Sequence, residues 1–110
     1  MKNDDLLKKL DFDKGKGLIP VIVQQADTKE LLMLAYANEE ALRQTLSTGY
    51  AHYWSRSRNK LWLKGETSGH TQKIKKILTD CDYDTLVYIV EQKCPPCHTG
   101  KDTCFHNKLK

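Results

Sequence analysis

The strongest constraint on the fold is a succession of short apolar runs separated by turn-forming residues. Residues 18–25 and 31–36 flank a polar turn at 26–29, which predicts a β-hairpin, and Pro20 suits the start or the edge of its first strand. Residues 86–90, Leu-Val-Tyr-Ile-Val, give the strongest strand pattern in the chain. No apolar run approaches the roughly 20 residues that a membrane helix needs. We therefore expect a core built from short strands and no membrane association.

One segment has the spacing of a helix instead. Asn38 is a favourable N-cap, and the helix dipole favours the acidic residues that follow it. The expected buried stripe consists of Ala41, Leu42, Thr45 and Leu46. Gly49 stands where a helix often ends. We predict one short helix near 39–48 that packs on the core.

The middle of the chain predicts a second hairpin, with strands at 50–55 and 61–64. A glycine-bounded polar loop at 65–69 follows, and then a strand at 70–79 with Ile74 and Leu78 on one side. The chain of 110 residues has the length of one domain, so we assign residues 1–110 to it. The predicted fold class is α+β, strand-rich, with antiparallel hairpins and one short helix.

Composition limits the cellular setting and the chemistry of the thiols. The N-terminus has no apolar signal-peptide region, so we expect a cytoplasmic protein. Thiols stay reduced in that compartment, and the four cysteines therefore favour metal binding or thiol chemistry over disulfides. The formal net charge of +4 is a mild basic excess, which suits a soluble surface or a phosphorylated ligand.

The acidic segment Asp-Cys-Asp-Tyr-Asp at 80–84 favours metal binding. In an extended backbone Asp80, Asp82 and Asp84 would point one way and Cys81 the other. Carboxylates suit Mg²⁺ and thiolates suit Zn²⁺, so the segment is predicted to contribute to two metal sites. A calcium-binding loop is disfavoured because Thr85 stands where the sharp turn requires glycine. A solvated acidic turn is the structural alternative.

The remaining thiols allow three interpretations. Cys94 and Cys97 have the spacing of a redox pair, although the two prolines between them do not begin a helix. A zinc knuckle would use Cys94, Cys97 and Cys104 with His98 or His106. Alternatively, Cys97 and Cys104 join the distant Cys81, and three protein ligands leave a fourth position for water. Spacing alone does not choose among these.

A hairpin from Trp54 to Trp62 interleaves aromatic rings with cations. It is a polar turn, a nucleic-acid surface, or a pocket for a phosphorylated nucleotide. The positive excess is small for a nucleic-acid-binding domain. The loop 65–70 offers amides, hydroxyls, a carboxylate and an imidazole, which suit phosphate binding or the positioning of a base. His52 lies in a strand pattern and is interpreted as a packed or surface residue.

These segments together resemble the phosphoribosyl-AMP cyclohydrolase family of histidine biosynthesis. The resemblance runs from about Gly17 to Phe105 and is carried by Gly-Leu-Ile-Pro-Val at 17–21, Met-Leu-Ala-Tyr at 33–36, Ala-His-Tyr-Trp-Ser-Arg-Ser-Arg at 51–58, Trp62, Lys-Gly-Glu-Thr-Ser-Gly-His at 64–70, Thr-Asp-Cys-Asp at 79–82, Asp84, and Cys-His-Thr-Gly at 97–100 with Cys104 and Phe105. A pyrophosphohydrolase domain is often fused to this enzyme, and we expect the monofunctional form.

The resemblance implies two metal sites and a dimer. Mg²⁺ would be bound by Asp80, Asp82 and Asp84. Zn²⁺ would be bound by Cys81, Cys97 and Cys104, in a site shared between the subunits of a homodimer. Cys94 does not belong to the family's ligand set. Lys101 and Asp102 depart from the aromatic or polar residue and the arginine expected between the last two zinc ligands.

The resemblance also implies the reaction. A zinc-activated water would open the adenine ring of 1-(5-phosphoribosyl)-AMP at the C6–N1 bond, the third step of L-histidine biosynthesis, giving the phosphoribosylformimino-aminoimidazole carboxamide ribotide. His98, or in second place His70, would move the proton. The substrate-binding residues would be Trp54 or Trp62 for stacking, Arg56, Arg58 and Lys60 for the two phosphomonoesters, and Glu66, Thr67 and Ser68 in the loop.

A small zinc-binding nucleic-acid module is the competing function. Its zinc would be held by Cys94, Cys97 and Cys104 with a histidine, and Cys81 would be dispensable. The enzyme instead requires Cys81 and tolerates loss of Cys94. Zinc content and ring-opening activity of Cys81→Ser and Cys94→Ser variants therefore separate the two functions.

Overall fold

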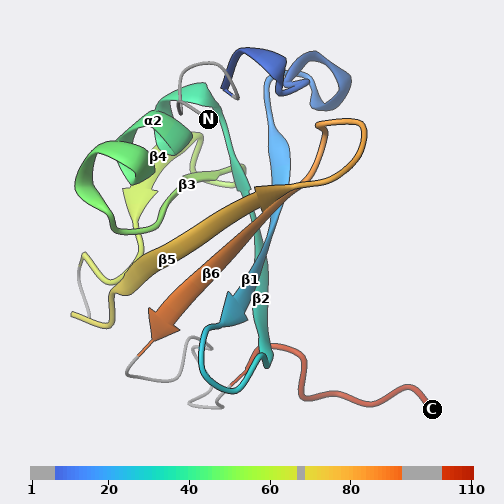
Figure 1. Cartoon of the computed structure of the whole chain (residues 1–110), viewed down its shortest axis with the longest axis vertical. Coiled ribbons are helices and arrows are strands. Elements are labelled where there is room, and N and C mark those ends of the chain that lie inside the picture. Colours follow the sequence, from blue (N-terminus) through green and yellow to red (C-terminus); the bar gives the residue numbers. More distant parts are fainter. Residues whose placement is uncertain (1–6, 67–68, 93–102) are drawn as a thin grey trace.

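A computed structural model describes residues 7–66, 69–92 and 103–110. The elements are the 3-10 helix η1 (Asp13–Gly15), strands β1 (Ile19–Gln25) and β2 (Leu31–Ala37), helix α2 (Glu39–Thr48), and strands β3 (His52–Ser55), β4 (Lys60–Leu63), β5 (Gln72–Thr79) and β6 (Leu86–Gln92). Figure 1 shows α2 and the β3–β4 hairpin on the same side of the larger sheet. The predicted strand-rich α+β fold is confirmed. Within the described ranges no helix has the length and apolar character that a membrane span requires.

Four strands form a mixed sheet in the order β2-β1-β6-β5, and β3 pairs with β4 in a separate ribbon. The consecutive pairs β1–β2, β3–β4 and β5–β6 are antiparallel hairpins, as the short polar turns require. The two central strands, β1 and β6, run parallel, with Val21 opposite Leu86. The first two hairpins follow the sequence pattern, whereas the parallel pair joins segments from opposite ends of the chain.

Alternating side chains place one face of the sheet in the core. Ile19, Val21 and Val23 of β1 are buried, as are alternate residues of β6. The buried ring of Tyr53 in β3 stacks on that of Tyr88 in β6, with centroids 5.7 Å apart. The small ribbon is therefore fixed against the centre of the larger sheet.

Helix α2 begins and ends as its sequence predicts. The Asn38 side chain accepts the backbone N–H of Ala41 at 2.8 Å, and Gly49, with φ 81°, donates its N–H to the Thr45 carbonyl at 2.9 Å. The buried Thr45 hydroxyl accepts the backbone N–H of His52 at 2.9 Å. This bond ties α2 to the start of β3, and His52 is packed at the edge of the core.

The expectation for β5 was wrong in one detail. Ile74 lies opposite Val90 on the core face, whereas Leu78 lies opposite Val87 on the other face and is 46% exposed. A β-bulge between Ile74 and Lys76 shifts the register, so Ile77 packs on the core instead. A bulge inserts one extra residue into a strand, which breaks the period of two on which the prediction depended.

The second face of the sheet carries apolar side chains as well. Leu34, Ile22, Val87 and Leu78 are paired in register across all four strands. We call these four residues the apolar row. Leu34 is 47% exposed, and the two central members are half-buried. Solvated faces of antiparallel sheets are usually polar, so this face has the composition of a contact surface.

Candidate functional site

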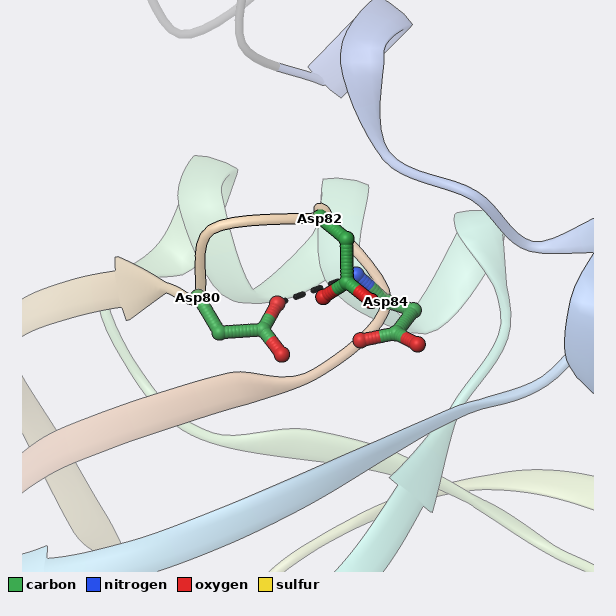
Figure 2. Close-up of side chains that lie close together, drawn as sticks. All are labelled: Asp80, Asp82 and Asp84. Carbon is green, nitrogen blue, oxygen red and sulfur yellow. Dashed lines mark hydrogen bonds between the residues drawn. The ribbon is translucent and has the colours of Figure 1, made fainter.

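The turn between β5 and β6 brings three carboxyl groups together. Oxygen atoms of Asp80, Asp82 and Asp84 lie within 4.8 Å of one another, and Figure 2 shows the side chains converging on the inside of the turn. Oδ1 of Asp80 accepts the backbone N–H groups of Asp84 at 3.1 Å and Thr85 at 3.2 Å. Tyr83 has φ 61°, a left-handed conformation that reverses the chain. The carboxylates therefore gather through a turn rather than through the extended backbone that the sequence suggested.

A lysine from the N-terminal segment lies against this acidic turn. Nζ of Lys14 is 2.9 Å from Oδ2 of Asp84 and 3.6 Å from Oδ2 of Asp82. The backbone N–H of Asp11 donates to the Tyr83 carbonyl at 2.7 Å, which holds the N-terminal segment on the turn. The bond to Lys14 is the main cause that lowers the pKa of Asp84 to about 2. The bond to Asp84 in turn raises the pKa of Lys14 above its ordinary value.

Asp82 titrates differently from its neighbour. Its hydrogen bond with Asp84 is the largest cause that raises its pKa above the usual value of an aspartate. The pKa values of these two neighbouring carboxyl groups are thus displaced in opposite directions. The bond to Lys14 lowers that of Asp84, whereas bonds to Asp84 and Asp80 raise that of Asp82. Close carboxylates repel when both are charged, and a cation between them relieves that repulsion.

The two cysteines within the described residues lie at opposite edges of the sheet. Cys81 is exposed in the turn after edge strand β5, and the backbone N–H of Cys104 donates to the Leu32 carbonyl of the other edge strand, β2, at 2.7 Å. Three strand spacings of about 4.8 Å separate these edges. In Figure 1 the β5–β6 turn and the start of the C-terminal segment lie far apart. Cys94, Cys97 and His98 lie outside the described residues.

A cleft of about 530 Å³ lies between β2 and the β3–β4 hairpin. Its lining combines aromatic rings with charged and hydroxyl groups: Tyr36, Trp54, Ser55, Ser57, Arg58, Trp62, Lys64 and Glu66. The guanidinium carbon of Arg56 lies 3.9 Å from the centre of the Tyr36 ring. Aromatic walls and cations in one cleft suit a nucleotide, whose base stacks and whose phosphates attract arginine.

The glycine-bounded loop after β4 lies at one end of this cleft. Gly65 has φ 89°, and a Cβ at that position would lie 2.5 Å from the backbone carbonyl carbon of His70. The N–H of Gly69 donates to the Gly65 carbonyl at 2.7 Å, which closes the loop. Gly65 is thus required by both backbone conformation and close approach. The loop holds Glu66 in the cleft lining, and the exposed His70 lies two residues before β5 begins.

Sequence reasoning placed some of the cleft residues correctly together and omitted others. Trp54, Trp62, Arg58 and Glu66 line the cleft. Arg56 does not line it and lies over the ring of Tyr36, a residue of its wall, and Lys60 is exposed at the start of β4, also outside the lining. Thr67 and Ser68 lie outside the described residues. Tyr36 and Lys64 were not among the predicted site residues. Tyr36 was interpreted as the end of an apolar strand, and the strand pattern alone does not show that its ring lines a cleft.

Comparison with known proteins identifies the class of protein. A sequence model described as phosphoribosyl-AMP cyclohydrolase matches residues 33–106. The phosphoribosyl-AMP cyclohydrolase of Archaeoglobus fulgidus is 63% identical over 101 residues, which cover 92% of this chain and 93% of that protein. The protein of that name from Nitrosopumilus maritimus is 56% identical over 107 residues, 97% of this chain and 99% of the relative. That from Streptococcus thermophilus is 60% identical over 101 residues, covering 92% and 90%.

These matches define the chain as an enzyme of the hydrolase class. More closely, it belongs to the phosphoribosyl-AMP cyclohydrolase family.

Proposed function

We propose that this chain opens the adenine ring of 1-(5-phosphoribosyl)-AMP by hydrolysis of the C6–N1 bond, as a step in histidine biosynthesis. The observation that carries this proposal is the family match, since two relatives of that name are 63% and 56% identical over more than nine-tenths of this chain. The cleft supports it, because a substrate with one base and two phosphomonoesters needs both stacking surfaces and cations.

The proposed substrate contacts follow from the cleft. Trp54 or Trp62 stacks on the base, and Arg58 binds a phosphomonoester through its guanidinium. Arg56 binds the second phosphomonoester from its place above Tyr36. Lys60 attracts the anionic substrate from outside the cleft, and Glu66 with Thr67 and Ser68 orients it at the loop.

The aspartate cluster fits Mg²⁺. Its donors are carboxylate oxygens within reach of one ion, and Mg²⁺ prefers oxygen ligands and keeps several waters. We propose that Asp80, Asp82 and Asp84 hold this ion. Magnesium would there neutralise the repulsion among the carboxylates and orient phosphate or water near the turn.

The proposed zinc ligands fit zinc by chemistry but need two chains. Two sulfurs that bind one zinc lie roughly 4 Å apart, given Zn–S bonds of about 2.3 Å. The opposite edges that carry Cys81 and Cys104 do not meet that requirement within one chain. We propose that Cys81 of one subunit meets Cys97 and Cys104 of a second in a homodimer. Zinc bound there would lower the pKa of a coordinated water to about 7.

A histidine moves the proton in the proposed reaction. Addition of water at C6 makes that carbon tetrahedral, and the C6–N1 bond then breaks. The water loses a proton to the imidazole of His98, with His70 as the second candidate. The imidazole then donates this proton to N1, the nitrogen that leaves C6. The cleft aromatics hold the base in place and exclude bulk water during these steps.

The Cys81→Ser variant tests this proposal, with Cys94→Ser as the matched control. Turnover of phosphoribosyl-AMP is followed by near-ultraviolet absorbance, and zinc by elemental analysis of the purified proteins. We expect Cys81→Ser to lose zinc and at least about a hundredfold in kcat/KM. Loss of a residue that only hydrogen-bonds a metal ligand typically costs about 10- to 100-fold, and loss of the ligand itself is more severe. Cys94→Ser should retain both. Full activity in Cys81→Ser contradicts the zinc assignment, and no turnover in the unmodified protein contradicts the function.

A further inference from the structure

The contact between Tyr36 and Arg56 joins two elements that lie far apart in the sequence. Tyr36 is the penultimate residue of β2, paired in register with Pro20 of the neighbouring strand, and its ring is half-buried in the cleft wall. Arg56 begins the exposed turn that follows β3. The 3.9 Å distance from the guanidinium carbon to the ring centre is within the range of a cation–π contact.

This ring is the contact that restrains the Arg56 side chain. The ion pairs within the described residues involve Lys14, Arg43 and Lys75, and none includes Arg56. The backbone around Arg56 belongs to an exposed turn, whereas that of Tyr36 belongs to a paired strand. An arginine chain has many rotamers, so a ring fixed by a strand reduces the freedom of the guanidinium before any ligand binds.

The orientation suits an anionic ligand. A guanidinium that lies over an aromatic face keeps its N–H donors at its edges, where they can bind a phosphate in the bidentate manner. Arg58 lies two residues further along the same turn and lines the cleft, as does Lys64, which directly follows β4. Arg56 lies next to this cleft through its contact with Tyr36. Without the ring, Arg56 would keep its charge, but its guanidinium would no longer be held in one position.

We propose that Tyr36 is a positioning residue that holds Arg56 at the cleft for one phosphomonoester of the substrate. This inference rests on the proposed function, and it adds a residue that acts through Arg56 rather than on the reacting atoms. The ring, not the phenol hydroxyl, carries the role, because the contact is to the aromatic face.

A double-mutant cycle tests the inference, with Tyr36→Leu, Arg56→Ala and the double variant. We expect Tyr36→Leu to raise KM for phosphoribosyl-AMP about two- to fivefold, the value of an exposed cation–π contact, with kcat within about twofold of the unmodified protein. Arg56→Ala should raise KM about tenfold or more, as loss of a charged hydrogen bond predicts. The double variant should resemble Arg56→Ala alone, because the ring acts through that arginine.

Tyr36→Phe should restore the kinetics of the unmodified protein, and Tyr50→Leu is the control for loss of an exposed tyrosine outside the cleft. Tyr36→Met keeps apolar bulk without an aromatic face, so it replaces Tyr36→Leu if that variant does not fold. An unchanged KM in Tyr36→Leu, or in Tyr36→Met where that variant replaces it, overturns the inference. The inference is also wrong if Tyr36→Leu raises KM by the same factor in the unmodified protein and in the Arg56→Ala variant. The ring would then act on the substrate directly.

Binding of AMP, measured by calorimetry on the same variants, separates this inference from the proposed function. If the unmodified protein does not turn over phosphoribosyl-AMP, the function is wrong, but a non-additive loss of AMP binding still supports the Tyr36–Arg56 unit. If turnover is normal and both kinetics and AMP binding are additive, the function stands and the positioning role is wrong.

Discussion

At the residue scale, Lys14 shapes the electrostatics of the acidic turn. It lies 2.9 Å from Asp84, and this bond is the main cause of that carboxyl's low pKa of about 2. A divalent cation at the aspartates would meet an ammonium group already in place. The N-terminal segment and the proposed magnesium site are therefore linked through one side chain.

The Lys14→Met variant should alter the acid sensitivity of the turn. The folded-state pKa of Asp84 lies below the ordinary value of about 3.9 for an aspartate, so the ion pair adds stability above that ordinary value and loses it as the pH falls through about 2. In Lys14→Met the pKa should rise towards the ordinary value, and this contribution should disappear. Carboxyl NMR titration and urea midpoints between pH 5 and pH 2, both in chelator, measure these changes.

Lys16→Met is the matched control, because Lys16 is an exposed lysine that forms none of the ion pairs found within the described residues. Its titration of Asp84 should match that of the unmodified protein. If Lys14→Met leaves the Asp84 titration unchanged, Lys14 is not the cause of the low pKa.

The sequence predicted that the three aspartates act together, but not how the backbone gathers them. Residue type alone indicated hard-cation chemistry, and that part needs no coordinates. The turn depends on the left-handed Tyr83 and on backbone bonds to Asp80, which a rule about alternating strand residues does not include. Lys14 was missed for a different reason, since 66 residues or more separate it from the aspartates in sequence and only the fold joins them.

At the scale of elements, the loop between β4 and β5 depends on a single glycine. Gly65→Ala should destabilise the protein by about 2 kcal/mol or more, because the positive φ costs about 1 kcal/mol and the new Cβ would collide with the His70 backbone. The displaced loop should also lower kcat/KM, since Glu66 lies in the cleft. Chemical denaturation and steady-state kinetics of the variant measure both effects.

Gly49→Ala is the matched control for that substitution. Gly49 has nearly the same positive φ, 81°, but a Cβ there would meet no atom within 4 Å. It should therefore cost about 1 kcal/mol and leave kcat/KM unchanged. Equal losses of stability in the two variants would mean that the approach to His70 has no structural importance.

Hairpins were predictable as elements, whereas their pairing into one sheet was not. Short polar turns predicted at 26–29 and 56–60 signal local antiparallel pairs, and both hairpins form, although Lys60 already belongs to β4. The bulge in β5 has no marker in the sequence, and it moved Leu78 to the face opposite the core. The parallel pairing of β1 with β6 depends on burial of both strands at the sheet centre, a property of the assembled core.

At the scale of the whole molecule, the apolar row and the separated cysteines point to the same proposed assembly. Leu34, Ile22, Val87 and Leu78 cross the face that is opposite the core. A second subunit on this face would cover them, and a crossing of the two sheets along a diagonal would bring the β5–β6 turn of one subunit towards the C-terminal segment of the other.

Leu78→Lys should weaken this proposed dimer by at least about tenfold, because an unpaired charge at an apolar contact is costly. It should lower zinc content in parallel. Light scattering after size-exclusion chromatography measures the mass, and Leu109→Lys, at a fully exposed leucine, is the control. A Leu78→Lys protein that keeps the mass and the zinc of the unmodified protein would exclude this face as the dimer contact.

The parallel pairing of β1 and β6 has a consequence for the order of folding. Gln25 at the end of β1 bonds Gln92 at the end of β6, 67 residues later. Contacts of such long sequence separation close late and slow the folding of small domains. During synthesis the first hairpin leaves the ribosome long before its central neighbour exists, with one edge of β1 unpaired. The growing chain must therefore keep that edge from associating with other chains until nearly the whole domain has been made.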